Sequence, residues 1–189
     1  MFPSHLVDEH NSQYPGTTTA YRRDALLDTY GQIDIERDTF TVQAEKYEHM
    51  QTAKENDAIG GARVLLEHPE ESETLLVSNR GEEGWDIPGG AREPGETPEE
   101  TASREVVEEV GLPVNLGEPL QMFDWGFVPE SGDCERVGGL WIHFEGVVAS
   151  DDTTITVQEA ELLEAEWFDT PPANVDPPAE PIVEAFFSE

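Results

Sequence analysis

Three glutamates fall within five residues of this chain, Glu105, Glu108 and Glu109, directly behind Arg104. Like charges this close together destabilise a helix unless something compensates them. Carboxylate and backbone carbonyl oxygens are the ligands that Mg²⁺ or Mn²⁺ prefers in proteins. A glycine pair that ends at Gly90 allows the backbone to approach the same ion closely. The cluster therefore has two interpretations, a solvated acidic helix face or a divalent-cation site.

The helix that must carry these carboxylates spans residues 97–110. Thr97 stands at the N-cap and Pro98 at the first helical position, where its missing N–H costs nothing. Glu100 completes a capping box, and Gly111 ends the helix. These signals define the helix boundaries and therefore predict which side chains share a face.

With about 100° per residue, the three glutamates share an arc of roughly 100° on this helix. Arg104 borders the acidic face, where it can pair with Glu108 or Glu100. A neighbouring face is apolar and is expected to pack inward; its residues are Ala102, Val106 and Val110.

The chain is acidic throughout its length, with 42 Asp and Glu against 10 Lys and Arg in 189 residues and a net charge of −32. This composition predicts a solvated acidic surface. It also resembles that of proteins from salt-accumulating halophiles, because at about 1 M salt the Debye length is only about 3 Å and such a surface stops repelling itself. Binding to nucleic acids or anionic membranes requires clustered basic residues. We therefore expect no DNA or RNA binding.

No window of the sequence approaches about 18 consecutive apolar residues, and the first residues contain no apolar run of signal-peptide length. The single cysteine, Cys134, excludes an internal disulfide. These features predict a cytoplasmic protein without a membrane partner.

The pattern of predicted elements changes near residue 57. Residues 1–56 are expected to form an N-terminal extension with two helices, at 19–30 and 41–56. Residues 57–189 mix strands and helices, which favours an α/β or α+β sandwich. The expected strands are 58–68, 74–80, 116–125, 138–149 and 165–169, with loops at 81–90 and 126–137 and a terminal helix at 179–187.

Residues 90–112 resemble the signature of the Nudix hydrolases, in which Gly and Glu at fixed spacing precede Arg-Glu-aliphatic-any-Glu-Glu-any-Gly-aliphatic. The chain has all nine fixed positions: Gly90, Glu96, Arg104, Glu105, Val106, Glu108, Glu109, Gly111 and Leu112. The resemblance implies an α/β fold for residues 57–189, a Nudix-type α/β/α sandwich around a mixed sheet. Residues 1–56 lie outside it as a helical extension.

The resemblance also implies a reaction. A pyrophosphohydrolase of this family uses Mg²⁺ (or Mn²⁺) to cleave a diphosphate linkage in a nucleoside diphosphate joined to another moiety. Such a nucleotide derivative would be the substrate of this protein. By the same resemblance Glu105, Glu108 and Glu109 would be metal ligands, and a carbonyl of Gly90 or Gly89 would complete the coordination.

Two further box residues receive supporting roles from the resemblance. Arg104 would orient the helix carboxylates, and Glu96 would brace the loop or hold the metal indirectly. The general base would be a box glutamate or a glutamate outside the box. Glu159, Glu161 and Glu164 are the outside candidates. The resemblance selects Glu161, because family members often carry an acid six residues before a Trp-Phe strand, although a surface or capping acid is the alternative.

Four residues are candidates for binding the substrate. Trp125 and Phe127 could stack on a base, although strand aromatics are more often part of a core. Arg80 and Arg92 flank the glycine loop and could pair with phosphate. For the two arginines, ordinary surface ion pairs are the alternative.

The sequence leaves other functions open. A nucleotide-sensing module that has lost activity is the alternative to an enzyme, although the intact box argues against it. An isopentenyl diphosphate isomerase on the same fold would need a catalytic cysteine, and Cys134 in a polar loop suits that role poorly. The apolar stripes of the two N-terminal helices could pack on their own sheet or on a second subunit, in a homodimer. The sequence does not identify the moiety linked to the diphosphate.

Overall fold

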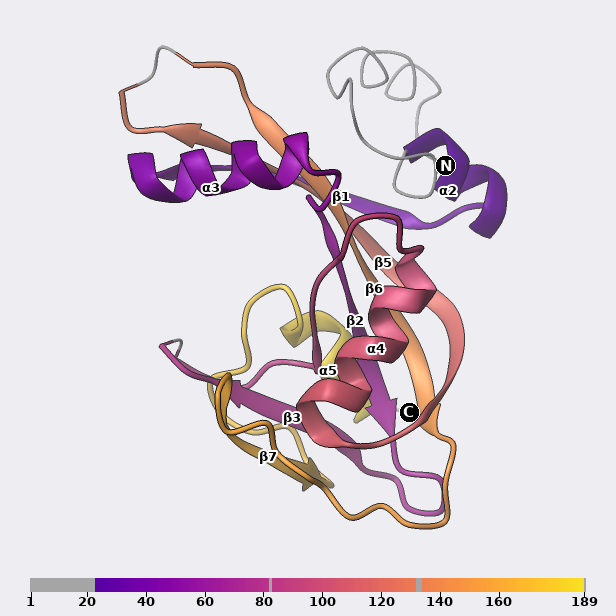
Figure 1. Cartoon of the computed structure of the whole chain (residues 1–189). Helices are drawn as coiled ribbons and strands as arrows, with labels where there is room; N and C mark the ends of the chain where they lie inside the picture. Colours follow the sequence, from indigo (N-terminus) through magenta and orange to yellow (C-terminus); the bar gives the residue numbers. More distant parts are fainter. Residues whose placement is uncertain (1–22, 82, 132–133, 189) are drawn as a thin grey trace.

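The computed structural model describes residues 23–81, 83–131 and 134–188. Within them, seven strands form one mixed sheet in the order β1-β5-β6-β2-β3-β7, with β4 paired to β2 beside this path (Figure 1). The strands are β1 (Asp34–Val42), β2 (Gly61–Glu67), β3 (Thr74–Asn79), β4 (Gly89–Ala91), β5 (Val114–Pro129), β6 (Val137–Val148) and β7 (Leu162–Phe168). The helices are α2 (Arg23–Tyr30), α3 (Ala44–Glu55), α4 (Pro98–Val110) and α5 (Glu180–Phe186).

The central strand β2 divides its pairing between two neighbours. Along one edge it runs parallel to β6 over its whole length. Along the other edge residues 61–63 pair with β4, and Leu66 and Glu67 pair with β3. The short β4 therefore lies beside the first half of β2, where the sheet meets α4.

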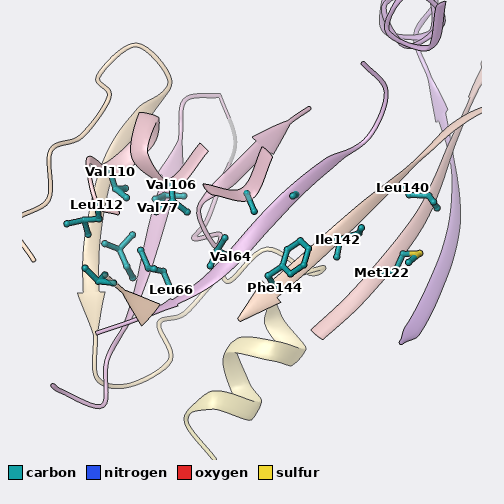
Figure 2. Close-up of a cluster of buried hydrophobic side chains, with 14 of the residues drawn as sticks. Val64, Leu66, Val77, Val106, Val110, Leu112, Met122, Leu140, Ile142 and Phe144 are labelled. Carbon is teal, nitrogen blue, oxygen red and sulfur yellow. The ribbon is translucent and has the colours of Figure 1, made fainter. Parts of the chain in front are cut away.

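Alternation along the strands produces two apolar layers. On one face Ala102, Val106 and Val110 of α4 pack against the sheet, and every one of them is fully buried. Figure 2 shows this core, including Val64 of β2 and Ile142 of β6. On the other face the C-terminal helix α5 covers a second cluster. Its buried residues are Leu65, Leu76, Ile87, Ala179 and Val183. The α/β/α sandwich expected for this chain is confirmed.

Both expected N-terminal helices are present. Residues 19–22, where the first helix was expected to begin, lie outside the described part of the chain. This helix, α2, ends at Tyr30, and Gly31 follows with a φ of 76°. The second helix, α3, begins at Ala44 rather than at residue 41, because Thr41 and Val42 belong to a strand.

That strand, β1, was not predicted from the sequence. It pairs in parallel with β5 along nine residues, from Asp34 opposite Gln121 to Val42 opposite Pro129. Arg37 and Arg136 both reach the fully buried Asp124, at 3.2 and 3.0 Å. The N-terminal extension is therefore part of the same sheet as the rest of the fold.

The two expected loops are shorter than predicted. Strand β5 continues to Pro129 and β6 begins at Val137, so the connection between them covers only residues 130–136. The other loop contains β4, which is formed by the glycine pair and Ala91. None of the helices in the described part of the chain combines the length and the apolar character that crossing a membrane demands.

Candidate active site

The glutamate-bearing helix α4 begins and ends where the sequence predicts. The Glu100 N–H donates to the Thr97 hydroxyl at 3.3 Å, and the Thr97 N–H donates to the Glu100 carboxylate at 2.9 Å. Gly111 ends the helix in the left-handed region, with a φ of 75°. This reciprocal cap fixes the register of the helix and therefore the direction of each glutamate.

The three box glutamates occupy two different environments. Glu105 and Glu109 are buried, with 7% and 4% of their surface exposed, whereas the Glu108 side chain is 49% exposed. The difference arises because β4 passes along one side of the acidic arc and covers it. The arc predicted from helical spacing is thus half buried and half solvated.

The glycine pair of β4 makes this close approach possible. A Cβ on Gly90 would lie 2.7 Å from the Glu105 carboxylate, so a larger residue there would displace that carboxylate. The Gly89 N–H donates to Glu109 Oε2 at 2.8 Å, and Gly89 has a φ of 147° that residues with side chains rarely adopt. The glycines bring backbone directly against the two buried carboxylates.

Arg104 links the helix to the loop before it. Its guanidinium donates to Glu96, to Glu105 and to Glu108, at distances of 2.7, 2.8 and 3.0 Å. It also donates to the Ala91 carbonyl of β4 at 3.0 Å. The pairing with Glu108 agrees with the sequence prediction, whereas Glu100 is instead engaged in the helix cap. These contacts support the expected role of Arg104 in orienting the carboxylates.

Glu96 connects the loop before α4 to the helix. Its carboxylate accepts hydrogen bonds from the Glu93 N–H and the Thr101 hydroxyl, both at 2.8 Å, besides those from Arg104. The hydrogen bonds from Arg104, with help from these donors, lower the pKa of Glu96 to about 2. Of the two roles expected for Glu96, its contacts support bracing the loop.

Burial dominates the electrostatics of the other two carboxyl groups. Desolvation raises the pKa of Glu109 to about 8, despite the hydrogen bond from Gly89 and the nearby charge of Arg63. Desolvation also raises the pKa of Glu105, although its hydrogen bond with Arg104 opposes the shift. A bound cation would favour the ionised form of both groups.

The buried carboxylates suit a hard divalent cation, because they supply oxygen ligands. Within the described residues, however, no three or more His, Cys, Asp or Glu side chains converge as a ready metal site. Arg104 engages both Glu105 and Glu108 in the structure. The two buried carboxylates fit a metal, and Glu108 would have to turn away from Arg104 to join them.

A cavity of about 390 Å³ lies beside Glu109, and we call it the active-site cavity. Its lining residues are Arg63, Asn79, Arg80, Gly89, Glu109, Ala160 and Glu161. It brings the candidate base Glu161 and the candidate phosphate ligand Arg80 to the same hollow as a box glutamate. Arg80 also anchors the segment that carries Glu161, because its side chain donates to the Glu159 carbonyl at 2.7 Å and its N–H to the Glu161 carbonyl at 2.8 Å.

Arg63 is a site residue that the sequence reasoning missed. Its guanidinium pairs with Asp86 at 2.5 Å and donates to the Ile87 carbonyl at 3.1 Å, and the residue lies opposite Gly89 in the sheet. The available signal was a single arginine within the otherwise apolar run 58–66, where an unpaired cation would be costly.

The remaining substrate candidates lie elsewhere. Arg92 is buried and its guanidinium pairs with Asp57 at 3.2 Å, so its phosphate contact stays a prediction that this ion pair disfavours. Trp125 and Phe127 belong to an aromatic group with Trp141, with ring centroids 5.1 and 6.0 Å from that residue. Neither of them lines the active-site cavity. Their stacking on a base stays a prediction.

The comparisons with known proteins agree with this geometry. The model of the NUDIX domain matches residues 59–186. Mouse diphosphoinositol polyphosphate phosphohydrolase 3-alpha is 47% identical over 55 residues, which cover 29% of this chain and 34% of that protein. A putative 8-oxo-dGTP diphosphatase of Bacillus subtilis is 39% identical over 63 residues, which cover 33% of this chain and 42% of that protein. The chain thus spans less than half the length of these curated relatives.

Solved structures share the fold at low sequence identity. A NUDIX-family hydrolase from Clostridium perfringens superposes with a TM-score of 0.53 at 17% identity, covering 69% of this chain and 97% of that one. A UDP-X diphosphatase superposes with a TM-score of 0.50 at 20% identity, covering 76% of this chain and 71% of that one. Since the domain model spans well over half of the sequence, the chain belongs to the Nudix family.

Proposed function

We propose that this protein is a Mg²⁺-dependent pyrophosphohydrolase that cleaves a diphosphate linkage in a nucleoside diphosphate joined to another moiety. One observation carries the proposal: the buried Glu109 lines a cavity that is also lined by Glu161 and two arginines. The names of the relatives support it, since they describe a phosphohydrolase and diphosphatases.

The chain supplies the groups that this reaction needs. Glu105, Glu108 and Glu109 would hold Mg²⁺ (or Mn²⁺), with a carbonyl of Gly90 or Gly89. The ion, when bound, neutralises phosphate oxygens and lowers the pKa of a coordinated water. Arg104 keeps the carboxylates in place through its contacts with the loop and the helix.

The active-site cavity supplies the remaining chemistry. In our proposal Glu161 accepts the proton of the attacking water, which a carboxylate within reach of that water can do. Arg63 and Arg80, which line the same cavity, attract the diphosphate oxygens. These two cations matter in a chain of net charge −32, because the surrounding field repels an anionic substrate.

A nucleotide panel tests the proposal. We expect release of monophosphate or phosphate from at least one nucleoside diphosphate derivative with Mg²⁺ present and none with EDTA. Glu161→Gln should lower kcat at least tenfold. Glu166→Gln, an exposed residue of β7, is the matched control and should behave like the parent. Binding of a nucleotide without any turnover would favour the alternative, a nucleotide-sensing module.

A further inference from the structure

A second cavity, of about 300 Å³, lies between α3 and the sheet, and we call it the α3 cavity. It lies on the face of the sheet opposite α4, because Trp141 in its wall alternates along β6 with Leu140 and Ile142, which pack in the α4 core. Figure 1 shows α3 lying along the extended β5–β6 hairpin, away from α5. Nothing in the hydrolytic chemistry described above uses this space.

The lining of the α3 cavity differs from the rest of the molecule. Its walls are mainly apolar and include Met50, Ala53, Ile59, Ala91 and the partly exposed indole of Trp141. The buried Arg92 also lines it, but its guanidinium is paired with Asp57. His49, Thr52 and Asn56 of α3 provide an exposed polar rim. None of the described residues that line it is Asp or Glu, although 42 of the 189 residues of the chain are acidic. An aromatic wall with a few polar groups and no carboxylate suits a flat, uncharged ring.

Strand β4 connects the two cavities. Gly89 lines the active-site cavity and Ala91 lines the α3 cavity. These residues are two apart in one strand, so they face the same side of the sheet at a separation of about 7 Å. The same relation holds on the neighbouring strand, where Arg63 of the active-site cavity lies two residues beyond Gly61, the partner of Trp141. The linings of the two cavities therefore meet along β4 and β2 on this face of the sheet.

We propose that the α3 cavity binds the nucleobase of the substrate while the diphosphate lies in the active-site cavity. The inference rests on the proposed function for the diphosphate site, and it adds where the base of that substrate would bind. Only two cationic side chains, Arg63 and Arg80, line the active-site cavity in the described structure, too few for a ring that carries many phosphates. A single diphosphate with an aromatic base matches both cavities.

Uncharged nucleosides test this site without metal and without turnover. Adenosine, guanosine, cytidine and uridine are titrated into the full chain in EDTA, and the indole N–H resonance of Trp141 is followed by NMR after assignment with Trp141→Phe. We expect a saturable shift with at least one nucleoside and none with ribose. Thr52→Phe fills the cavity from the exposed side of α3 and should weaken this nucleoside at least tenfold. Gln51→Phe, on the next exposed residue outside the lining, should leave its affinity unchanged.

The outcomes separate the two proposals. His49→Phe is a second filling variant on the rim. It should also weaken the nucleoside at least tenfold, and it replaces Thr52→Phe if that variant fails to fold. The inference is overturned if no nucleoside shifts the Trp141 resonance, if ribose shifts it equally, or if a folded filling variant binds like Gln51→Phe. Because these measurements require no hydrolysis, a protein that binds nucleosides here and cleaves no diphosphate would refute the proposed activity and retain the base site.

Discussion

Glu109→Gln tests how strongly the fold opposes a charge at the buried box glutamate. In the metal-free protein burial raises the pKa of Glu109 from 4.5 to about 8. Because the pKa of this carboxyl is higher in the folded state than in the unfolded state, its ionisation does not lower the free energy of unfolding below about pH 4.5. The loss of free energy grows as the pH rises and levels off above about pH 8. Glutamine cannot ionise, so the substitution removes this pH-dependent cost.

The size of the effect follows from one pKa unit being worth about 1.4 kcal/mol. Between pH 6 and pH 8 the ionisation of Glu109 should lower the free energy of unfolding by about 2 kcal/mol in the parent and by nothing in Glu109→Gln. The glutamine also places an amide N–H₂ beside Gly89, but that penalty is the same at both pH values. The change in the free energy of unfolding between pH 6 and pH 8, compared between the parent and Glu109→Gln, therefore isolates the ionisation of Glu109.

Urea unfolding in EDTA at pH 6 and pH 8 measures this change for the parent, Glu109→Gln and the exposed control Glu166→Gln. The control should follow the parent, since every other titrating group is shared. Added Mg²⁺ should restore stability at pH 8 in the parent and much less in Glu109→Gln. If the parent and Glu109→Gln lose the same stability between the two pH values, Glu109 is not held neutral by burial.

Three further predictions concern turnover, salt and the N-terminal segment. Glu108→Gln should lower kcat at least a hundredfold with little change in stability, because the side chain is 49% exposed; retained activity would remove Glu108 from the site. The melting temperature should rise steeply up to molar KCl, as salt screens a net charge of −32, and a flat profile between about 0.1 and 2 M would contradict the salt-adapted surface. Deleting residues 1–56 should give insoluble protein or a monomer with altered substrate affinity. Sedimentation of the full chain as a monomer would exclude the homodimer.

The sequence was most informative where local signals decide the structure. Thr97, Glu100 and Gly111 specify both ends of α4 through contacts within a few residues, and the helix has those ends. The same reasoning could not separate Glu105 and Glu109 from Glu108, because helical spacing places all three on one arc. Their burial depends on β4, which reaches α4 only through its pairing with β2.

Features that depend on distant pairing escaped prediction. Strand β1 lacks an apolar alternation, and its position is set by β5, far along the chain. Arg63 has no motif around it, and its relation to Glu109 appears only when the sheet places it opposite Gly89. The α3 cavity likewise requires α3 and Trp141 to meet across the sheet. Each of these depends on tertiary packing, which single-sequence patterns do not contain.

The position of β1 has a consequence for the order in which the protein is made. Asp34 pairs with Gln121 and Val42 with Pro129, so β1 leaves the ribosome long before its partner strand exists. Parallel pairing over such a sequence separation is slow, and an apolar strand that stays unpaired meanwhile can associate with other nascent chains. The sequence of β1 is DIERDTFTV, with four charged side chains in nine residues. The same polarity that leaves this strand without an apolar alternation keeps it hydrated until β5 is synthesised.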